Sequence, residues 1–251
     1  MKRTSSSLIF ILVVSSLFWT GAFFTRRLYL ERRASQVTTL RRIASHPHSE
    51  YKLPNALFTQ LLGITPQTSL HALNCNALKE HLLATSVFED IHLSKAPPST
   101  LYISYSMKKP VAKLAANENI GIDIHGNLFP LHPFYPPLRL PSLFISPSTA
   151  EQELAIGLEI LSLLQPICKK HSLQLSTIDL SRSTHTSFFR RESVVTLLSP
   201  QNEPIYLRLN TKKIEETQAS LSKLLSRLNT TKSGTIDLRF EKIALVSEEF
   251  L

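Results

Sequence analysis

The sequence predicts an α+β fold tethered by a single N-terminal transmembrane helix. Thr4 to Thr25 contains no charged residue, and its most apolar part is Leu8–Phe24. As a helix, the uncharged stretch would be about 33 Å long, which is enough to cross a bilayer. Behind it, segments with leucines at helical spacing are interspersed with segments in which apolar and polar residues alternate. No later segment is as long and as apolar, so we predict one span.

The basic residues gather beside the apolar segment. The chain has 251 residues and a net charge of +9, and residues 1–50 contain eight basic and two acidic residues, a net of +6. A nucleic-acid-binding protein would be expected to have a basic stripe on its folded domain. Attraction to anionic lipid headgroups explains this distribution more simply. We therefore expect membrane lipid around Leu8–Phe24 and no nucleic acid as partner.

The direction and the fate of the apolar segment stay open at this point. Lys2 and Arg3 precede it and six arginines follow it, so the positive-inside count favours a cytoplasmic C-terminal side. The residues Thr20-Gly21-Ala22 loosely resemble a signal-peptide cleavage site, although Phe23 and Phe24 continue the apolar run. The residues alone therefore leave both a retained anchor and a cleaved signal peptide possible.

The first part of the folded chain predicts two helices on one face of a small sheet. We expect a short strand near Val37–Ile43, with His46-Pro47-His48 as a breaker. The helices are predicted from Leu53 to Leu62, ended by Gly63, and at Asn74–Ala84. Two strands, Val87–Lys95 and Thr100–Met107, are predicted around a turn at Pro97-Pro98.

The second part predicts a β-rich domain with two helices on an antiparallel or mixed sheet. The helices are Ala150–His171 and the strongly amphipathic Lys212–Leu228. The predicted strands are short: Val111–Ala116, Ile120–Ile124, Leu128–Phe129, Leu143–Ser146, Ser176–Leu180, Ser193–Leu198, Ile205–Leu209 and Thr235–Val246.

The sequence contains no motif that supports catalysis. Serine-hydrolase, zinc-protease and phosphate-loop signatures are absent, and Cys75 and Cys168 match no metal or redox spacing, which leaves a disulfide open. Asp123 precedes a turn and is expected to cap it. Asp179 and Asp237 each follow an isoleucine within a predicted strand, and we interpret them as charges at strand ends or edges that discourage wrong pairing, in preference to a catalytic acid–base pair. We therefore expect that the protein is not an enzyme and that it binds no metal, no cofactor and no small-molecule substrate.

The terminal segment is the best candidate for binding another protein. If the strand Thr235–Val246 lies at a sheet edge, its outer side is open to strand addition. Arg239 and Phe240 are residue types common at binding hot spots. The alternative is a final strand that is fully paired within the chain. The candidate binding residues are Ile236, Asp237, Leu238, Arg239, Phe240, Glu241, Lys242, Ile243, Ala244, Leu245 and Val246.

The order of short motifs resembles the FtsQ/DivIB family of bacterial cell-division proteins over nearly the whole chain. The stretches that match the POTRA part of that family are Leu61–Ile64, Leu78, Leu82-Leu83, Val87–Leu93 and Pro98–Ile103. Those that match the hinge and the β domain are Lys109–Ala112, Ile122–Phe129, Leu140–Leu143 and Ile236–Phe240.

The resemblance implies a domain order along the chain. It gives a cytoplasmic tail (1–7), a transmembrane helix (8–25), a juxtamembrane linker (26–36), a POTRA domain (37–109) and a β domain (110–251). It also implies a single-pass inner-membrane protein of type II, with a cytoplasmic N-terminus and periplasmic domains, against the positive-inside count.

The resemblance further implies a non-enzymatic scaffold of septum formation that links early and late division proteins. Its partners would be FtsB/DivIC-like and FtsL-like chains, received at the terminal strand, with Arg239 and Phe240 in contact. Arg182 resembles a family arginine that pairs with a partner carboxylate. The alternative is a POTRA-containing component of secretion or outer-membrane assembly.

Overall fold

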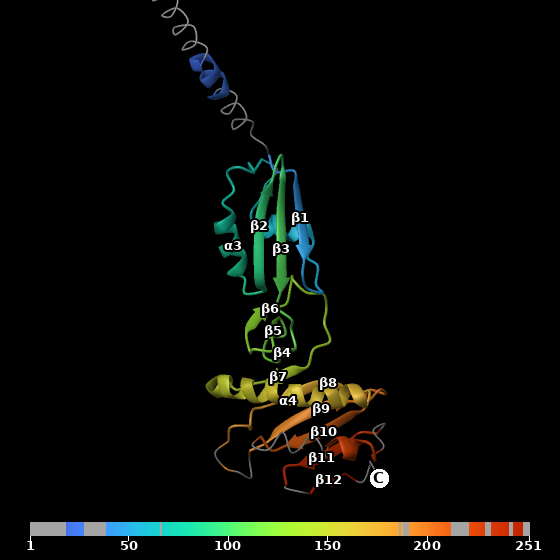
Figure 1. Ribbon diagram of the computed structural model, residues 1–251. Helices are drawn as coiled ribbons and strands as arrows, with labels where there is room; N and C mark the ends of the chain where they lie inside the picture. Colours follow the sequence, from blue (N-terminus) through green and yellow to red (C-terminus); the bar gives the residue numbers. More distant parts are fainter. Residues whose placement is uncertain are drawn as a thin grey trace, which may run out of the picture. The chain divides into compact units, whose positions relative to one another are not determined.

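The structure is a computed structural model with an α+β fold built on two β-sheets (Figure 1). It describes residues 19–27, 39–65, 67–185, 187, 191–211, 221–228, 232–240 and 243–247. The chain divides into two compact units. The first comprises Met1–His46, Leu53–His81 and His92–Ser104, and the second Pro47–Lys52, Leu82–Ile91 and Tyr105–Leu251. Because this division runs through the strands of the smaller sheet, the boundary between residues 109 and 110 stays a prediction.

The predicted membrane segment lies mostly outside the described residues. Residues 19–27 are helical, and the side chains of Trp19, Phe23 and Phe24 on this helix are exposed. Among the residues that the structure describes, no helix combines the length and the apolar character needed to cross a membrane. Residues 1–18 and 28–38 are not described. The tail, the span and the linker therefore remain predictions.

The smaller sheet has three strands in the order β1-β3-β2. Its elements are β1 (Arg42–Pro47), α2 (Asn55–Leu61), α3 (Cys75–Leu83), β2 (Phe88–Ala96) and β3 (Thr100–Met107). Alternate residues of β3 are buried, as the sequence pattern requires when one face of a strand is covered. Leu57 and Phe58 of α2 and Leu82 of α3 are also buried. The two helices and the β2–β3 hairpin confirm the predicted elements.

The first strand differs from its prediction. We expected a strand near Val37–Ile43 that would be broken by His46-Pro47-His48, but β1 runs from Arg42 to Pro47. Pro47 is the last residue of this strand, which lies at an edge of the sheet. At such a position the missing proline N–H costs no hydrogen bond within the sheet. The strand therefore lies later in the chain than expected, and it ends within His46-Pro47-His48.

The larger sheet has nine strands in the order β12-β11-β10-β9-β8-β7-β4-β5-β6, and it is mixed. The strands are β4 (Ala112–Leu114), β5 (Ile120–Ile122), β6 (Leu128–Pro130), β7 (Ser142–Phe144), β8 (Gln174–Asp179), β9 (Ser193–Leu198), β10 (Pro204–Leu209), β11 (Gly234–Leu238) and β12 (Leu245–Val246). Except at its C-terminal end, the sheet follows the predicted succession of strands, with ends shifted by a few residues.

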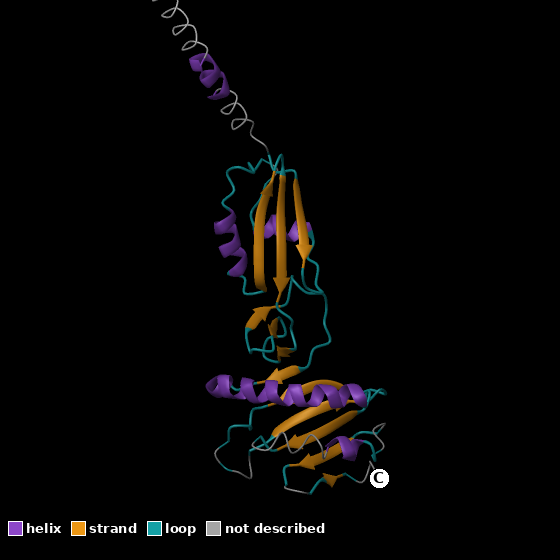
Figure 2. Ribbon diagram, viewed as in Figure 1, coloured by secondary structure: helices purple, strands orange, loops and turns teal. Residues whose placement is uncertain are grey.

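One face of the larger sheet is covered by helices. The long helix α4 (Ala150–Lys170) runs across the strands, as Figure 2 shows in purple. Its buried residues, such as Ile160, Leu161 and Leu164, share one core with Leu221 and Leu225. Residues 221–225 are helical, whereas residues 212–220 of the second predicted helix lie outside the described residues. Alternate residues of β9 and β10 face this core, so their other residues lie on the opposite face.

The predicted terminal strand is two strands. β11 ends at Leu238, and the chain returns to pair β12 with it antiparallel, Ile236 opposite Val246 and Asp237 opposite Leu245. The backbone N–H of Arg239 donates to the Asp237 carboxylate at 3.1 Å. This hydrogen bond over two residues is a turn that ends a strand. The single strand Thr235–Val246 with one open side was therefore a wrong expectation, because β12 already covers β11.

Candidate partner-binding site

A cluster of charged side chains lies at the C-terminal end of β10 and β11, on the sheet face away from α4. It consists of Arg182, Glu192, Arg208, Asp237 and Arg239, and we call it the ion cluster. Register places Arg208 directly beside Asp237 on the neighbouring strand, with side chains on the same face. Three arginines and two carboxylates leave the ion cluster with a net charge of +1.

Asp237 is held by two arginines. Arg239 donates from Nε to Asp237 Oδ1 at 2.9 Å and from Nη2 to Oδ2 at 2.7 Å, a two-pronged contact. The guanidinium of Arg208 lies 3.6 Å from Oδ2. Burial by itself raises the pKa of Asp237, but the hydrogen bonds from Arg239 and the charges of Arg239 and Arg208 outweigh it, so this pKa lies below its usual range. The hydrogen bond to Asp237 raises the pKa of Arg239.

Glu192 is the centre of the ion cluster. Its Oε2 accepts hydrogen bonds from Arg208 Nη2 at 2.6 Å and from Arg239 Nη1 at 3.1 Å, and its Oε1 accepts from Arg182 Nη1 at 3.3 Å. The Glu192 side chain is 7% exposed, whereas that of Arg182 is 70% exposed. Arg182 therefore makes one long contact inside the ion cluster and presents most of its guanidinium to solvent.

The ion cluster lies within a row of residues that crosses six strands on the same face. Register pairs link Phe144 to Asp179, Asp179 to Val194, Val194 to Arg208, Arg208 to Asp237, and Asp237 to Leu245. Exposed apolar side chains lie at both ends of the row, Phe144 on β7 and Leu245 on β12. A cavity of about 260 Å³ lies in the same region, lined by Asp179, Ser181, Arg182, Glu192 and Val194.

The backbone of β12 is open on its outer side within the described residues. The N–H of Ser247 donates to the carbonyl of Thr235 at 3.0 Å, so this opposed pair is a hydrogen-bonded one. Antiparallel strands alternate between bonded and non-bonded pairs. Val246 is therefore in a non-bonded position, and its N–H and C=O groups point away from β11. The same alternation, continued to Ala244 just before β12, places the Ala244 groups on that side as well. β12 is the last strand of the sheet, so these groups face outward.

Exposed apolar residues surround this edge. Phe240, Ile243 and Leu245 are all exposed. The guanidinium carbon of Arg239 lies 5.8 Å from the centre of the Phe240 ring, a cation–π distance. A terminal segment with open backbone groups, exposed apolar side chains and a net positive charge beside it matches the chemistry of a protein-binding edge.

The structure separates the predicted binding residues into three groups. Arg182, Asp237 and Arg239 meet in the ion cluster, although Arg182 is far from the others in sequence. Ile236 and Leu238 are buried, and their side chains face the core. The third group belongs to the terminal hairpin β11–β12 and consists of Phe240, Ile243, Ala244, Leu245 and Val246. Glu241 and Lys242 lie outside the described residues.

Sequence reasoning missed Glu192 and Arg208. The alternation of apolar and polar residues in β10 places Arg208 on the face away from the core, and this pattern could have identified Arg208 from the sequence. Glu192 precedes β9, beside a stretch that the structure does not describe, and no pattern in the sequence marks it. Its role depends on strand register, which brings residues distant in sequence together.

Other candidate residues have structural roles. The Asp123 carboxylate accepts hydrogen bonds from the N–H groups of His125 and Asn127 and from the Asn127 amide, which confirms the predicted turn cap. Both cysteines are free, and burial raises the pKa of the Cys168 thiol to about 11. The described residues contain no group of three or more His, Cys, Asp or Glu side chains placed to hold a metal ion.

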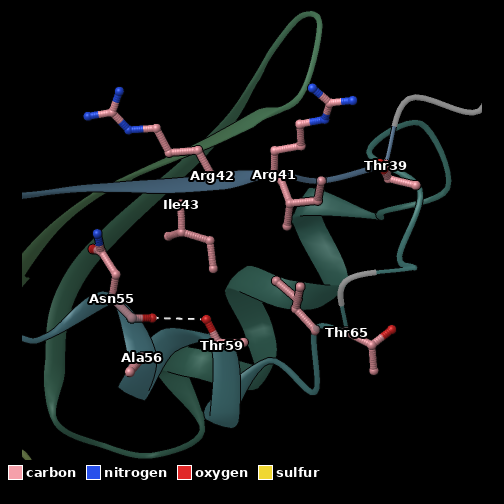
Figure 3. Close-up of a pocket in the computed structure, with 10 residues that line it drawn as sticks. Thr39, Arg41, Arg42, Ile43, Asn55, Ala56, Thr59 and Thr65 are labelled. Atoms are coloured by element: carbon pink, nitrogen blue, oxygen red, sulfur yellow. Dashed lines mark hydrogen bonds between the residues drawn. The ribbon is translucent and has the colours of Figure 1, made fainter.

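A larger cavity, of about 550 Å³, lies between the start of β1 and α2 (Figure 3). Asn55, Ala56 and Thr59 line it from α2, and Arg41, Arg42 and Ile43 from the other side. None of its lining residues is acidic. An isolated cavity of this kind, without titratable groups converging on its centre, does not support catalysis.

No protein-family model matches the chain, and no curated protein matches its sequence.

The ion cluster predicts how stability depends on pH. Because the pKa of Asp237 is lowered in the folded state, its contribution is fully present above the ordinary value of about 4. It is lost as the pH falls through the lower folded-state pKa. We expect the urea midpoint of the full-length protein to fall as the pH is lowered below about 4, and to fall less in Asp237→Asn. Equal pH slopes for the two proteins would contradict this assignment.

Proposed function

We propose that this chain is a non-enzymatic scaffold of septum formation in bacteria, organised like an FtsQ/DivIB protein. In this proposal Leu8–Phe24 anchors it in the inner membrane, and a POTRA domain precedes the β domain outside that membrane. The terminal hairpin β11–β12 receives an FtsB/DivIC-like and FtsL-like subcomplex. The protein thereby links early and late division proteins without chemistry of its own.

The observation that carries the proposal is the open edge of β12. The outward N–H and C=O groups of Val246, continued by those of Ala244 just before the strand, are suited to pairing with an added strand. Exposed edges of this kind are normally blocked by charge, proline or a covering element. Around this edge, Phe240, Ile243 and Leu245 are instead apolar and exposed, which supports a surface that is covered by a partner.

The ion cluster supports the orientation of that partner. Arg239 is fixed against Asp237 and Glu192, whereas Arg182 keeps most of its guanidinium in solvent. A partner carboxylate that reached Arg182 would add a charge-assisted hydrogen bond. It would also balance the net charge of the ion cluster. A strand added at β12 together with a carboxylate at Arg182 would fix both position and register.

Site-specific photocrosslinking in growing cells tests the proposal. A photoreactive residue at Phe240, Ile243 or Leu245 is expected to capture an FtsB/DivIC-like or FtsL-like chain. Leu128 is the matched control, because its side chain is 48% exposed and that of Phe240 is 49% exposed. It lies on β6, at the opposite edge of the same sheet.

Capture of the same chain from Leu128 and from Phe240 would contradict a site at the terminal hairpin. Capture of an outer-membrane assembly protein from the hairpin would instead favour a component of that machinery and overturn the division assignment. Failure to capture any membrane protein from all three hairpin positions would also count against the proposal.

A further inference from the structure

Three segments of the first unit converge at the end of the small sheet where the chain enters β1. These segments are residues 39–42, residues 64–71 without residue 66, and residues 94–100. We call the surface that they form the entry patch. The N–H of Leu40 donates to the Thr68 carbonyl at 2.9 Å, and the N–H of Arg41 to the Ser99 carbonyl at 2.9 Å. The Lys95 ammonium donates to the His71 carbonyl at 3.0 Å.

The entry patch is cationic and contains no acid. Arg41, Arg42 and Lys95 carry fixed positive charges and are exposed, and His71 is exposed as well. The three segments contain no aspartate or glutamate. No carboxylate in the described part of the chain forms an ion pair with Arg41 or Arg42. The charge of the patch is therefore directed to solvent rather than neutralised within the unit.

The backbone holds the two arginines on one side. The N–H of Arg42 donates to the Ser99 carbonyl at 3.2 Å, the same oxygen that accepts from Arg41. Two consecutive residues at the entry to β1 thus bond to a single carbonyl of the β2–β3 turn, much as two residues oppose one in a β-bulge. Consecutive residues of a regular strand would point to opposite faces. Figure 3 shows both arginine side chains extending to the same side, away from Asn55 and Thr59.

The chain places this patch within reach of the segment predicted to lie in a bilayer. Eleven residues, 28–38, separate Arg27, the last described residue of the N-terminal helix, from Thr39. Fully extended, they reach at most about 40 Å. A tether of this length keeps the patch at a high effective concentration near a membrane surface, so that a site with few charges suffices. A nucleic acid would need a longer basic stripe than three fixed cations.

We propose that the entry patch binds the phosphate groups of anionic phospholipids and thereby docks the first unit on the membrane surface. This inference rests on the anchor in the proposed function but not on its partner site. Each basic residue near an anionic surface contributes roughly fivefold to the association. Neutralising Arg41 and Arg42 is therefore expected to weaken docking roughly 25-fold.

Hydrogen exchange of the full-length protein in nanodiscs tests the proposal. We expect amides of residues 39–42, 67–71 and 94–100 to exchange more slowly in nanodiscs with phosphatidylglycerol than in nanodiscs of phosphatidylcholine alone. The variant Arg41→Gln/Arg42→Gln should lose this protection, and Arg41→Lys/Arg42→Lys should keep most of it. The matched control is Lys169→Gln/Lys170→Gln, which removes two adjacent exposed cations at the end of α4 and should leave the protection intact.

Two further arms separate the possible sources of phosphate and the effect of folding. Inorganic phosphate added to phosphatidylcholine nanodiscs should give no protection, and if it protects equally, the lipid assignment is overturned. Exchange of β2 and β3 amides outside the patch reports whether the glutamine variant is folded. Protection that is the same in both lipids, or that persists in the folded glutamine variant, overturns the proposal. Neither result bears on partner capture at the terminal hairpin.

Discussion

Replacing Glu192 by alanine is expected to destabilise the second unit by about 3 kcal/mol, because it removes the carboxylate shared by three arginines. Glu192 is almost completely buried, and the two arginines that contact its Oε2 are mostly covered. Without it, Arg208 and Arg239 share only Asp237, and a partly buried positive charge is left without a partner. The urea midpoint of the full-length protein, followed by pulse proteolysis, measures the change.

Two variants make this result specific. Glu203→Ala removes a carboxylate from the exposed turn between β9 and β10, and it should change stability by less than about 0.5 kcal/mol. Glu192→Gln keeps the shape and part of the hydrogen bonding, so its effect should lie between those of the two alanine variants. If Glu192→Ala and Glu203→Ala are equally stable, the ion cluster does not stabilise the fold.

The local pattern of the sequence predicted most of the fold. The spacing of leucines in α4 and the stop at Gly63 after α2 follow from backbone geometry within a few residues. Gly63 has a positive φ of 59°, which residues with a side chain adopt at a cost. The alternation in β3, β9 and β10 likewise depends only on which face of each strand is covered.

The parts that were missed depend on contacts between distant residues. Glu192 meets Arg208 and Arg239 only because β9, β10 and β11 pair in a particular register. The division of the last strand depends on the hydrogen bond from Arg239 to Asp237, which competes with continued pairing. The alignment of Arg41 and Arg42 depends on a single carbonyl of the β2–β3 turn. Periodicity within one segment carries no information about such pairs.

Replacing Ala244 by proline is expected to weaken partner binding at least tenfold while leaving the folded chain intact. The alternation of β12, continued by one residue, places the N–H of Ala244 on the side away from β11, so its loss should break no hydrogen bond of the terminal hairpin. Ala244 is exposed, so little packing is lost. A strand added at this edge would lose one backbone hydrogen bond, worth about 1 kcal/mol, and would meet the proline ring in place of a donor.

Retention of an FtsB/DivIC-like chain on tagged full-length protein measures this effect. Ala244→Ser is the matched control, since it keeps the N–H at the same exposed position and should bind as the unaltered protein does. Leu245→Pro tests the direction of the backbone, because the N–H of Leu245 faces β11 and its loss should also detach β12.

The three variants separate two ways of binding at the same edge. A partner that adds a strand to β12 depends on the outward N–H, so Ala244→Pro should fail where Ala244→Ser succeeds. A partner that contacts only the apolar side chains of Phe240, Ile243 and Leu245 would be retained by both. Equal retention by a folded Ala244→Pro variant would therefore rule out strand addition at Ala244. The exposed apolar surface and Arg182 would then remain as the binding determinants.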